Sequence, residues 1–339
     1  MLIFYVLVLL CCSVCESEEG DVRYDLNIGN TIDVFANYGD LSQVTQVVSA
    51  DYDDEYQEPI VPFSEKNLRV FANASSHSVV GGTMSKMNIQ MCDTFDDLLN
   101  TYFANFKIEG TDKPWKAFMG DWVTDEILRT MGVIYNGWQD NCCYVLVKWT
   151  KPHTNAQLDD LRDVAVKDHV GKAIEALNVS DTAAVRTFMR SYGTHYIESF
   201  LTGNFIYQVF KYKRSGYNLL RSYIKEKSSQ QSSTDNLRFY FASYFLKEVG
   251  DIRVASGNKT VEAWARKNLR ESQYLYSRPS LLKLHYSPSL AYKLNELLDS
   301  GALLGLDLKT LRPLFKDRSK GDKFAEIVEN DLQLWEVNS

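Results

Sequence analysis

The sequence predicts an α+β fold with a long bent strand, and three observations support this prediction. β-Branched and aromatic residues typical of strands are concentrated in three segments, at 68–92, 143–149 and 195–212. Apolar residues repeat at helical spacing in three others, at 95–106, 156–177 and 182–192. Gly203 interrupts the longest strand segment, as a bend or a bulge does.

The helix predicted at 182–192 has a recognisable start and end. Ser180 and Asp181 are residues that cap a first turn. The apolar positions of this helix follow i, i+3, i+4 and i+7 spacing and are Val185, Phe188, Met189 and Tyr192. Gly193 then stands where a left-handed residue commonly ends a helix. The chain is therefore expected to pass directly from helix into strand at His195.

The other elements follow from the same patterns. From Phe205 to Tyr212 the strand is apolar on both faces, so we expect helices to cover it on both sides. The helix at 95–106 has the apolar residues Phe95, Leu98, Leu99, Tyr102, Phe103 and Phe106. Residues 115–138 are aromatic-rich and are expected to be partly helical, whereas 236–249 fits a buried strand.

The N-terminal part of the chain predicts export. The apolar run from Leu2 to about Val14 is shorter than the ~20 residues that span a bilayer, and it fits a signal peptide at 1–16. No Lys or Arg precedes this run, and the alternative is a buried N-terminal strand. Residues 17–65 form an acidic, turn-prone segment in which 51–62, DYDDEYQEPIVP, is expected to be an exposed loop.

Sequons and cysteines add to this prediction. Asn73, Asn178 and Asn258 each begin an N-glycosylation sequon. Removal of the signal peptide would leave three cysteines, Cys92, Cys142 and Cys143, and an odd number leaves at least one thiol without an intramolecular partner. One interpretation is a disulfide from Cys92 to Cys142 or Cys143, and the other is three buried free thiols.

Charge and motifs exclude several functions. The net charge is −7, so no overall basic field would attract nucleic acid. The motifs HExxH, GxSxG and CxxC are absent, and the five histidines do not cluster: His77, His153, His169, His195 and His285. We therefore expect no catalytic residue, no metal site and no cofactor. His195 is expected to be structural, with its ring nitrogens satisfied within the helix-to-strand junction.

The junction carries a resemblance to a known family. The sequence Tyr-Gly-Thr-His-Tyr, followed after six residues by glycine, resembles the signature of the membrane-attack-complex/perforin (MACPF) family. The family pattern reads aromatic-Gly-Thr/Ser-His-aromatic, six residues, Gly-Gly. The matching positions are Tyr192, Gly193, Thr194, His195, Tyr196 and Gly203. The chain departs from the pattern at Asn204, where the family has its second glycine, and Asn tolerates unusual backbone angles better than most residues.

The resemblance implies a fold and a domain layout. It covers roughly 66–300 and implies a bent, twisted four-stranded antiparallel sheet with two helical clusters between its strands. The remaining 301–339 is then a basic, helical C-terminal tail. In pore-forming members of the family the two clusters unfurl into transmembrane hairpins.

The residues that would form these hairpins argue against a pore. A spanning strand needs about 9–11 residues that alternate apolar and polar. The second cluster is barely long enough for two such strands, and Lys225–Asn236 at its centre contains no apolar residue. The compact, exported chain is instead similar to a non-lytic member of the family, which implies an extracellular developmental signalling factor. The alternative is a pore-former that oligomerises on membranes and perforates them.

The expected partners follow from that resemblance and from charge. The resemblance implies an extracellular protein ligand, or components of a receptor tyrosine kinase pathway in embryonic terminal patterning, and association with the eggshell matrix. One basic cluster that fits a polyanion or an anionic membrane surface is Lys211, Lys213, Arg214, Arg221, Lys225 and Lys227. A second is Lys309, Arg312, Lys316, Arg318, Lys320 and Lys323. The alternative is that both clusters are solvated charged faces.

Overall fold

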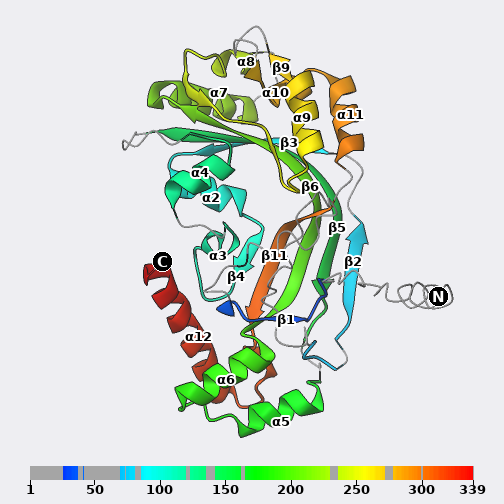
Figure 1. Cartoon of the computed structure of the whole chain (residues 1–339), viewed down its shortest axis with the longest axis vertical. Coiled ribbons are helices and arrows are strands. Elements are labelled where there is room, and N and C mark those ends of the chain that lie inside the picture. The colour runs from blue at the N-terminus through cyan, green and yellow to red at the C-terminus, as the bar shows by residue number, and fades with distance from the viewer. Residues whose placement is uncertain are drawn as a thin grey trace, which may run out of the picture.

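Two long antiparallel strands form the centre of a bent sheet (Figure 1). They are β5 (Cys143–Leu158) and β6 (His195–Tyr212), and they pair from Cys143↔Tyr212 to Gln157↔Ser199. The computed structural model describes residues 26–36, 41, 69–72, 74–80, 85–119, 123–134, 142–161, 165–229, 236–271, 278–298 and 301–338. The predicted strand at 143–149 is confirmed but is longer than predicted, because it continues to Leu158.

Shorter strands succeed one another along both edges of this pair. On the β5 side lie β3 (Lys86–Cys92) and then β2 (Ser76–Val80). On the β6 side lie β7 (Leu246–Val249) and β8 (Arg253–Val254), and then β11 (Ala302–Thr310). β1 (Thr31–Ile32) pairs with the first residues of β6, and β4 (Phe106–Ile108) lies beside β11.

This sheet confirms the predicted α+β class and corrects its details. The described sheet has nine strands rather than four, because each edge is built from several short strands. It is mixed rather than antiparallel, because β4 and β11 run parallel. A separate two-stranded sheet joins β9 (Arg270–Glu271) to β10 (Arg278–Pro279).

The strand pairing is irregular beside Gly203, where a bend or a bulge was predicted. Gly203 pairs with Pro152 of β5 and with Ala302 of β11, and both neighbouring strands shift register beside it. A Cβ at this position would stand 2.5 Å from the Lys151 carbonyl oxygen, with φ at 157°. Only glycine therefore allows the three strands to approach closely enough to turn together.

Helices cover both faces of the sheet (Figure 1). The concave face carries α2 (Phe95–Tyr102), α3 (Trp115–Met119) and α4 (Thr124–Thr130). The convex face carries α7 (Arg214–Ser229), α8 (Leu237–Tyr240), α9 (Lys259–Asn268), α10 (Leu282–His285) and α11 (Pro288–Leu297). Two separate apolar cores result, with Tyr207 and Val209 of β6 in one and Ile206 and Phe210 in the other. The prediction that Phe205–Tyr212 is covered on both sides is thus confirmed.

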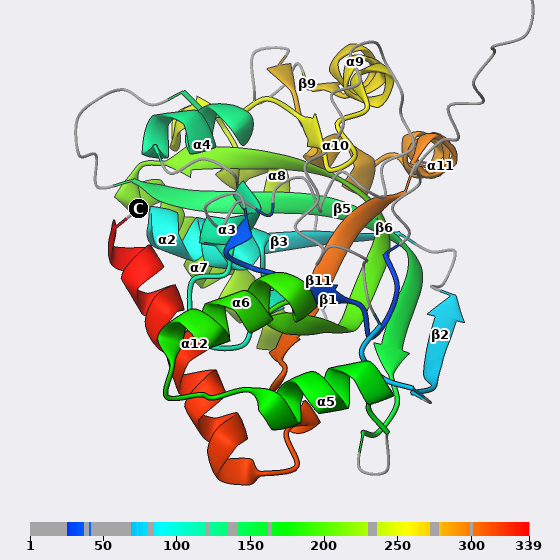
Figure 2. The same ribbon diagram turned by 60° about the horizontal axis from the view of Figure 1, so that its bottom comes forward.

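The remaining helices gather at the other end of the sheet (Figure 2). These are α5 (Asp168–Ala176), α6 (Thr182–Tyr192) and α12 (Arg318–Asn338), with the short 3₁₀ helix η2 (Arg312–Leu314) between β11 and α12. No helix in the described part of the chain is long and apolar enough to cross a membrane.

Several predicted boundaries were wrong. The helix expected at 156–177 begins at Asp168, because residues 156–158 still pair with β6 and β2. The strand expected at 236–249 begins at Leu246, after α8 and a turn. Phe106 belongs to β4 rather than to the helix at 95–106.

The domain limits also change. The segment 301–339 is not only a tail, because Ala302–Thr310 is a strand of the main sheet. Part of the acidic segment 17–65 joins the fold as well, through β1. The predicted signal peptide at 1–16 and the loop at 51–62 lie outside the described residues.

The predicted disulfide is not present. Cys92, Cys142 and Cys143 are all free and buried. Cys92 pairs in register with Tyr144, so the next residue, Cys143, points to the opposite face and lies in the convex core. Cys142 shares the concave core but is a diagonal neighbour, and such Cα atoms are about 7–8 Å apart, beyond the usual disulfide span. Burial raises the pKa of the Cys92 thiol to about 11, which keeps it protonated and unreactive.

Candidate functional site

The signature motif forms the junction between α6 and β6. The Asp181 carboxylate caps α6 by accepting from the Ala183 and Ala184 amides at 2.9 and 3.3 Å. At the other end Gly193 has a positive φ of 85°, which glycine was predicted to supply, but its ψ of 176° is extended rather than left-handed helical. Its amide donates to the Met189 carbonyl. A Cβ on Gly193 would stand 2.9 Å from Thr31 Cβ, so β1 could not lie so close to any other residue.

Thr194 joins the junction to the N-terminal strand. It is fully buried, and its amide donates to the Ile32 carbonyl at 2.9 Å. Its hydroxyl oxygen accepts from the Val34 amide at 3.0 Å. The motif position directly after the glycine therefore holds β1 in the sheet, which explains why a small hydroxyl residue suits it.

Both ring nitrogens of His195 are hydrogen-bonded within the fold. Nε2 lies 2.8 Å from the Glu109 carbonyl and must donate to it, because a carbonyl oxygen only accepts. Nδ1 lies 2.9 Å from Thr194 Oγ1. Burial lowers the pKa of His195 to about 4, so the ring is neutral and Nδ1 is an acceptor that faces the Thr194 hydroxyl. The same hydroxyl also donates to the Ile32 carbonyl at 3.1 Å. The side chain is fully buried and both of its ring nitrogens have partners, as expected for a structural histidine.

Glu109 extends this network to β11. Its amide donates to the Leu308 carbonyl at 2.9 Å. Its carboxylate accepts from both the amide and the hydroxyl of Thr310, at 2.8 and 3.1 Å. The end of β4 is thus bonded to β6 through His195 and to β11 through Thr310.

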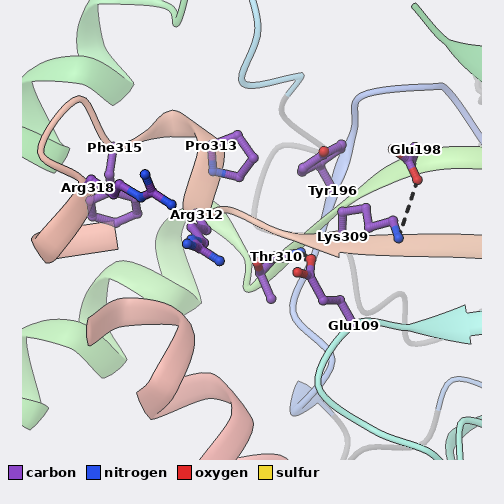
Figure 3. Close-up of a pocket in the computed structure, with 9 residues that line it drawn as sticks. All are labelled: Glu109, Tyr196, Glu198, Lys309, Thr310, Arg312, Pro313, Phe315 and Arg318. Atoms are coloured by element: carbon purple, nitrogen blue, oxygen red, sulfur yellow. Dashed lines mark hydrogen bonds and ion pairs between the residues drawn. The ribbon is translucent and has the colours of Figure 1, made fainter. Parts of the chain in front are cut away.

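A pocket of about 410 Å³ opens beside this network (Figure 3). It is lined by the ends of β11 and β6, by the η2 turn and by the first residue of α12, and its residues are Glu109, Tyr196, Glu198, Lys309, Thr310, Arg312, Pro313, Phe315 and Arg318. We call it the junction pocket. Tyr196 belongs to the signature motif, so the motif contributes directly to its wall.

Charges in the junction pocket are arranged in two groups. Lys309 Nζ lies 3.7 Å from Glu198 and 3.6 Å from Asp307. Burial lowers the pKa of Lys309, but Asp307, Glu198 and Glu109 outweigh it, so this pKa is raised overall. At the other end Arg312 forms a 2.6 Å ion pair with Asp322, and Arg318 is exposed on the first turn of α12.

The junction pocket is lined mainly by charged and polar side chains. Among the described residues no group of three His, Cys, Asp or Glu side chains is placed to hold a metal ion. His195 contacts a threonine hydroxyl and a carbonyl, both inside the fold. What the junction pocket offers is polar side chains for binding.

The position at which the motif departs from the family pattern has its own partner. Asn204 is fully buried, and its side-chain amide donates to Ser256 Oγ at 3.1 Å. The Ser256 amide returns a longer bond to Asn204 Oδ1 at 3.4 Å. The residue next to the bend is therefore fastened to the loop between β8 and α9.

Not every residue of the first basic cluster lies on the surface. Lys211 is buried in β6 opposite Glu248, so the prediction that it contacts a polyanion is wrong. Lys213 donates to the Tyr244 carbonyl at 2.9 Å, and Arg221 pairs with Asp93 at 3.0 Å. Arg214 and Lys225 are exposed on α7, and the side chain of Lys227 lies outside the described residues.

The second basic cluster is divided. Lys309, Arg312 and Arg318 converge on the junction pocket. Lys320 instead caps the end of α5 by donating to the Ile174 and Glu175 carbonyls. Lys316 lies 3.8 Å from Glu175, and Lys323 is exposed.

Two of the three sequons lie in the described residues. Asn178 is exposed, and its Oδ1 accepts from the Ser180 amide at 3.1 Å. Asn258 caps α9 through Oδ1, which accepts from the Val261 amide at 3.0 Å. Asn73 lies outside the described residues.

Sequence reasoning found only part of this site. The three cations of the junction pocket were recognised as basic residues, and Tyr196 was recognised through the motif. Glu109 and Glu198 carried no signal, because they meet Lys309 and Thr310 only when β4, β6 and β11 lie side by side.

No family model matches the sequence, and no curated protein is detectably similar to it. Solved structures give distant likenesses. A protein with a MAC/Perforin domain from Bacteroides thetaiotaomicron is 9% identical, with 90% of this chain and 59% of that chain covered and a TM-score of 0.39. GNIP1Aa from Chromobacterium piscinae is 11% identical, with 91% of this chain and 57% of that chain covered and a TM-score of 0.42.

A third similar structure is Astrotactin-2, described as a vertebrate-specific, perforin-like membrane protein involved in neuronal development. It is 8% identical, with 81% of this chain and 40% of that chain covered and a TM-score of 0.29. The chain spans less than two thirds of each of these three structures. All three TM-scores lie below 0.5, so these likenesses are weak.

Proposed function

We propose that this chain is a secreted MACPF-family protein that acts without perforating membranes. The signature motif at the α6–β6 junction and the bent sheet with helices on both faces support the family. By resemblance the chain is most like Torso-like, a secreted insect member of the family. That resemblance implies an extracellular developmental factor in embryonic terminal patterning, upstream of the Torso receptor tyrosine kinase and associated with the eggshell.

The observation that carries the non-lytic proposal is the attachment of the first helical cluster to the sheet. This cluster follows β3 and precedes β5, and β4 lies within it. β4 pairs with β11 from Leu306↔Phe106 to Leu308↔Ile108, and Glu109 adds three further bonds to Leu308 and Thr310. Unfurling the cluster would break this pairing and remove the carbonyl partner of His195.

A buried lysine adds a second attachment. Lys148 of β5 donates to the Tyr102 carbonyl at 3.0 Å and to the Thr101 carbonyl at 3.3 Å, which satisfies the C-terminal end of α2. Its Nζ also lies 4.9 Å from the Tyr102 ring centroid and 5.1 Å from that of Phe205. Both contacts would be lost if α2 left the sheet.

The bend and the second cluster support the same proposal. Asn204 replaces a glycine beside the bend and is bonded to Ser256, which opposes hinge motion there. In α7 the buried Tyr217 and Leu220 face the convex core. The apolar-free run Lys225–Asn236 would place several polar side chains against lipid, at about 2–4 kcal/mol for each Lys or Arg at the midplane.

The test is dye release from anionic liposomes by the purified, secreted protein, with a lytic perforin as positive control. We expect intact liposomes at every protein concentration that lyses with the control. Dye release accompanied by ring-shaped oligomers would overturn the proposal and favour the pore-forming alternative. The signalling part is tested separately, by Torso phosphorylation in receptor-expressing cells exposed to the protein, and unchanged phosphorylation would contradict it.

A further inference from the structure

We propose that the junction pocket binds an acidic sugar, meaning a hydroxyl-bearing ring that carries a sulfate or carboxylate group. This inference deepens the proposed function, because it rests on the protein being extracellular, where such sugars occur in matrix polysaccharides. It names a ligand class for a pocket that the signature motif helps to build (Figure 3). The pocket has two charged ends, with Pro313 in the wall between them.

The first end is suited to an anionic group. Arg312 and Arg318 lie together there, one on η2 and one at the start of α12. Arg312 shares its charge with Asp322 at 2.6 Å, whereas Arg318 forms no ion pair among the described residues. Guanidinium groups bind sulfate and carboxylate through paired hydrogen bonds. Asp322 neutralises only one of the two arginines, so one positive charge remains to bind an anion.

The second end is suited to hydroxyl groups. Glu198 and Lys309 lie 3.7 Å apart, so a ligand atom that contacts both must accept from the ammonium and donate to the carboxylate. A hydroxyl does both. A second anion would be repelled by Glu198 and Glu109, and an ammonium would be repelled by Lys309, so simple diacids and amino acids fit this end less well.

Tyr196 adds a hydrogen-bond donor to the wall of the pocket. Its side chain is only 3% exposed, and it lines the junction pocket. Burial and the nearby Glu198, Glu109 and Asp307 raise its pKa, so the phenol keeps its proton and remains a donor. A ligand oxygen in the pocket can therefore accept a hydrogen bond from the Tyr196 phenol.

The size and wall of the pocket agree with this class. A volume of about 410 Å³ is sufficient for one or two sugar rings. Pro313 lies between the two charged ends, and its apolar face can contact the C–H face of a ring (Figure 3). A sugar that reaches from the arginines to Glu198 would therefore use both ends and the wall at once.

The experiment is titration of the full, secreted protein with a heparin-derived tetrasaccharide, followed by calorimetry at fixed salt. We expect Arg318→Ala to weaken binding about tenfold or more, which corresponds to the loss of one charged contact. Tyr196→Phe keeps the ring and removes only the phenol, and we expect it to weaken binding several-fold. Lys213→Ala is the matched control, because it removes an exposed cation outside the pocket and should leave the affinity unchanged.

Two further arms identify what is recognised. Inorganic sulfate should bind far more weakly than the tetrasaccharide, because it uses only the arginine end. A tetrasaccharide that is both desulfated and carboxyl-reduced should also bind weakly, because it keeps the hydroxyl groups but has no anion. If Lys213→Ala weakens binding as much as Arg318→Ala, the contact is a general polyelectrolyte effect and the inference is wrong. No binding, or equal binding by wild type and Tyr196→Phe, also overturns it. These outcomes are independent of dye release, so the pocket can fail while the non-lytic proposal stands.

Discussion

The two helical clusters on opposite faces of the sheet are held in different ways. The first, at 93–134, contains a strand of the main sheet and is bonded to β6 and β11 by backbone groups, His195 and Thr310. In the second, at 213–245, the described residues form no strand, and α7 and α8 are held largely by packing of Tyr217, Leu220 and Phe241. The polar run at 225–236 argues against insertion of the second cluster into a membrane. The pairing of β4 with β11 argues against release of the first cluster from the sheet.

The largest expected difference comes from a matched pair of core substitutions. Leu99 of α2 and Leu220 of α7 are both fully buried, so Leu99→Ala and Leu220→Ala should each cost about 2–5 kcal/mol. Because the first cluster includes a sheet strand, Leu99→Ala should lower the global melting temperature and accelerate hydrogen exchange throughout β4 and β11. Leu220→Ala should accelerate exchange mainly in α7 and α8.

Hydrogen exchange read by mass spectrometry separates these outcomes. If Leu99→Ala and Leu220→Ala accelerated exchange over equally large parts of the sheet, the two clusters would be equally coupled to it. Leu219→Ala, at an exposed neighbouring position on α7, serves as the control and should leave both clusters protected.

Acid should weaken the attachment of the first cluster through His195. Its pKa is lowered from 6.5 to about 4 in the folded protein, so between these values the unfolded chain binds a proton that the folded chain does not. Stability from this group is therefore complete above pH 6.5 and is lost as the pH falls toward 4, by about 3 kcal/mol in total. Urea unfolding between pH 7 and pH 4 measures it.

The comparison variant is His195→Asn. It should be less stable at pH 7 and should lack this component of the pH dependence, so the difference between the two proteins should shrink as the pH falls. A difference that stays constant from pH 7 to pH 4 would contradict the assignment of the titration to His195.

Lys148 should give a second rise in stability with pH, this time in the alkaline range. Burial lowers its pKa from 10.5 to about 8, so the folded protein disfavours the charged form. The resulting penalty is complete below pH 8 and is relieved as the pH rises from 8 to 10.5, which should add about 1–3 kcal/mol of stability over that interval. Unfolding of wild type and Lys148→Met at pH 7.5 and pH 10 should reveal the rise only in wild type.

The smallest expected effect concerns the bend. Asn204→Gly restores the residue of the family pattern and removes the bonds to Ser256, at a cost of about 1–2 kcal/mol. We expect a melting temperature lower by a few degrees, faster exchange around Ser256 and no dye release, because the first cluster stays attached. Lysis by this single variant would mean that the bend, and not β4, restrains the fold.

The sequence by itself determined the elements whose signals are local. The α6 cap at Asp181, the apolar stripe of α6 and the positive φ of Gly193 all depend on residues close by in the chain, and each was predicted correctly. The irregularity at Gly203 could also be predicted, because a glycine within a strand pattern indicates a bend or a bulge. Burial of Phe205–Tyr212 on both faces could be predicted because its apolar residues do not alternate with polar ones.

Tertiary structure decided what depends on strand pairing. β4 has three residues, too few for a recognisable pattern, and β11 lies in a segment interpreted as a tail, yet their parallel pairing anchors the first cluster. Register placed Cys92 and Cys143 on opposite faces and so excluded their bond. The junction pocket exists for the same reason: Glu198 and Lys309 are far apart in the chain, and only the alignment of β6 with β11 brings their charges within 3.7 Å.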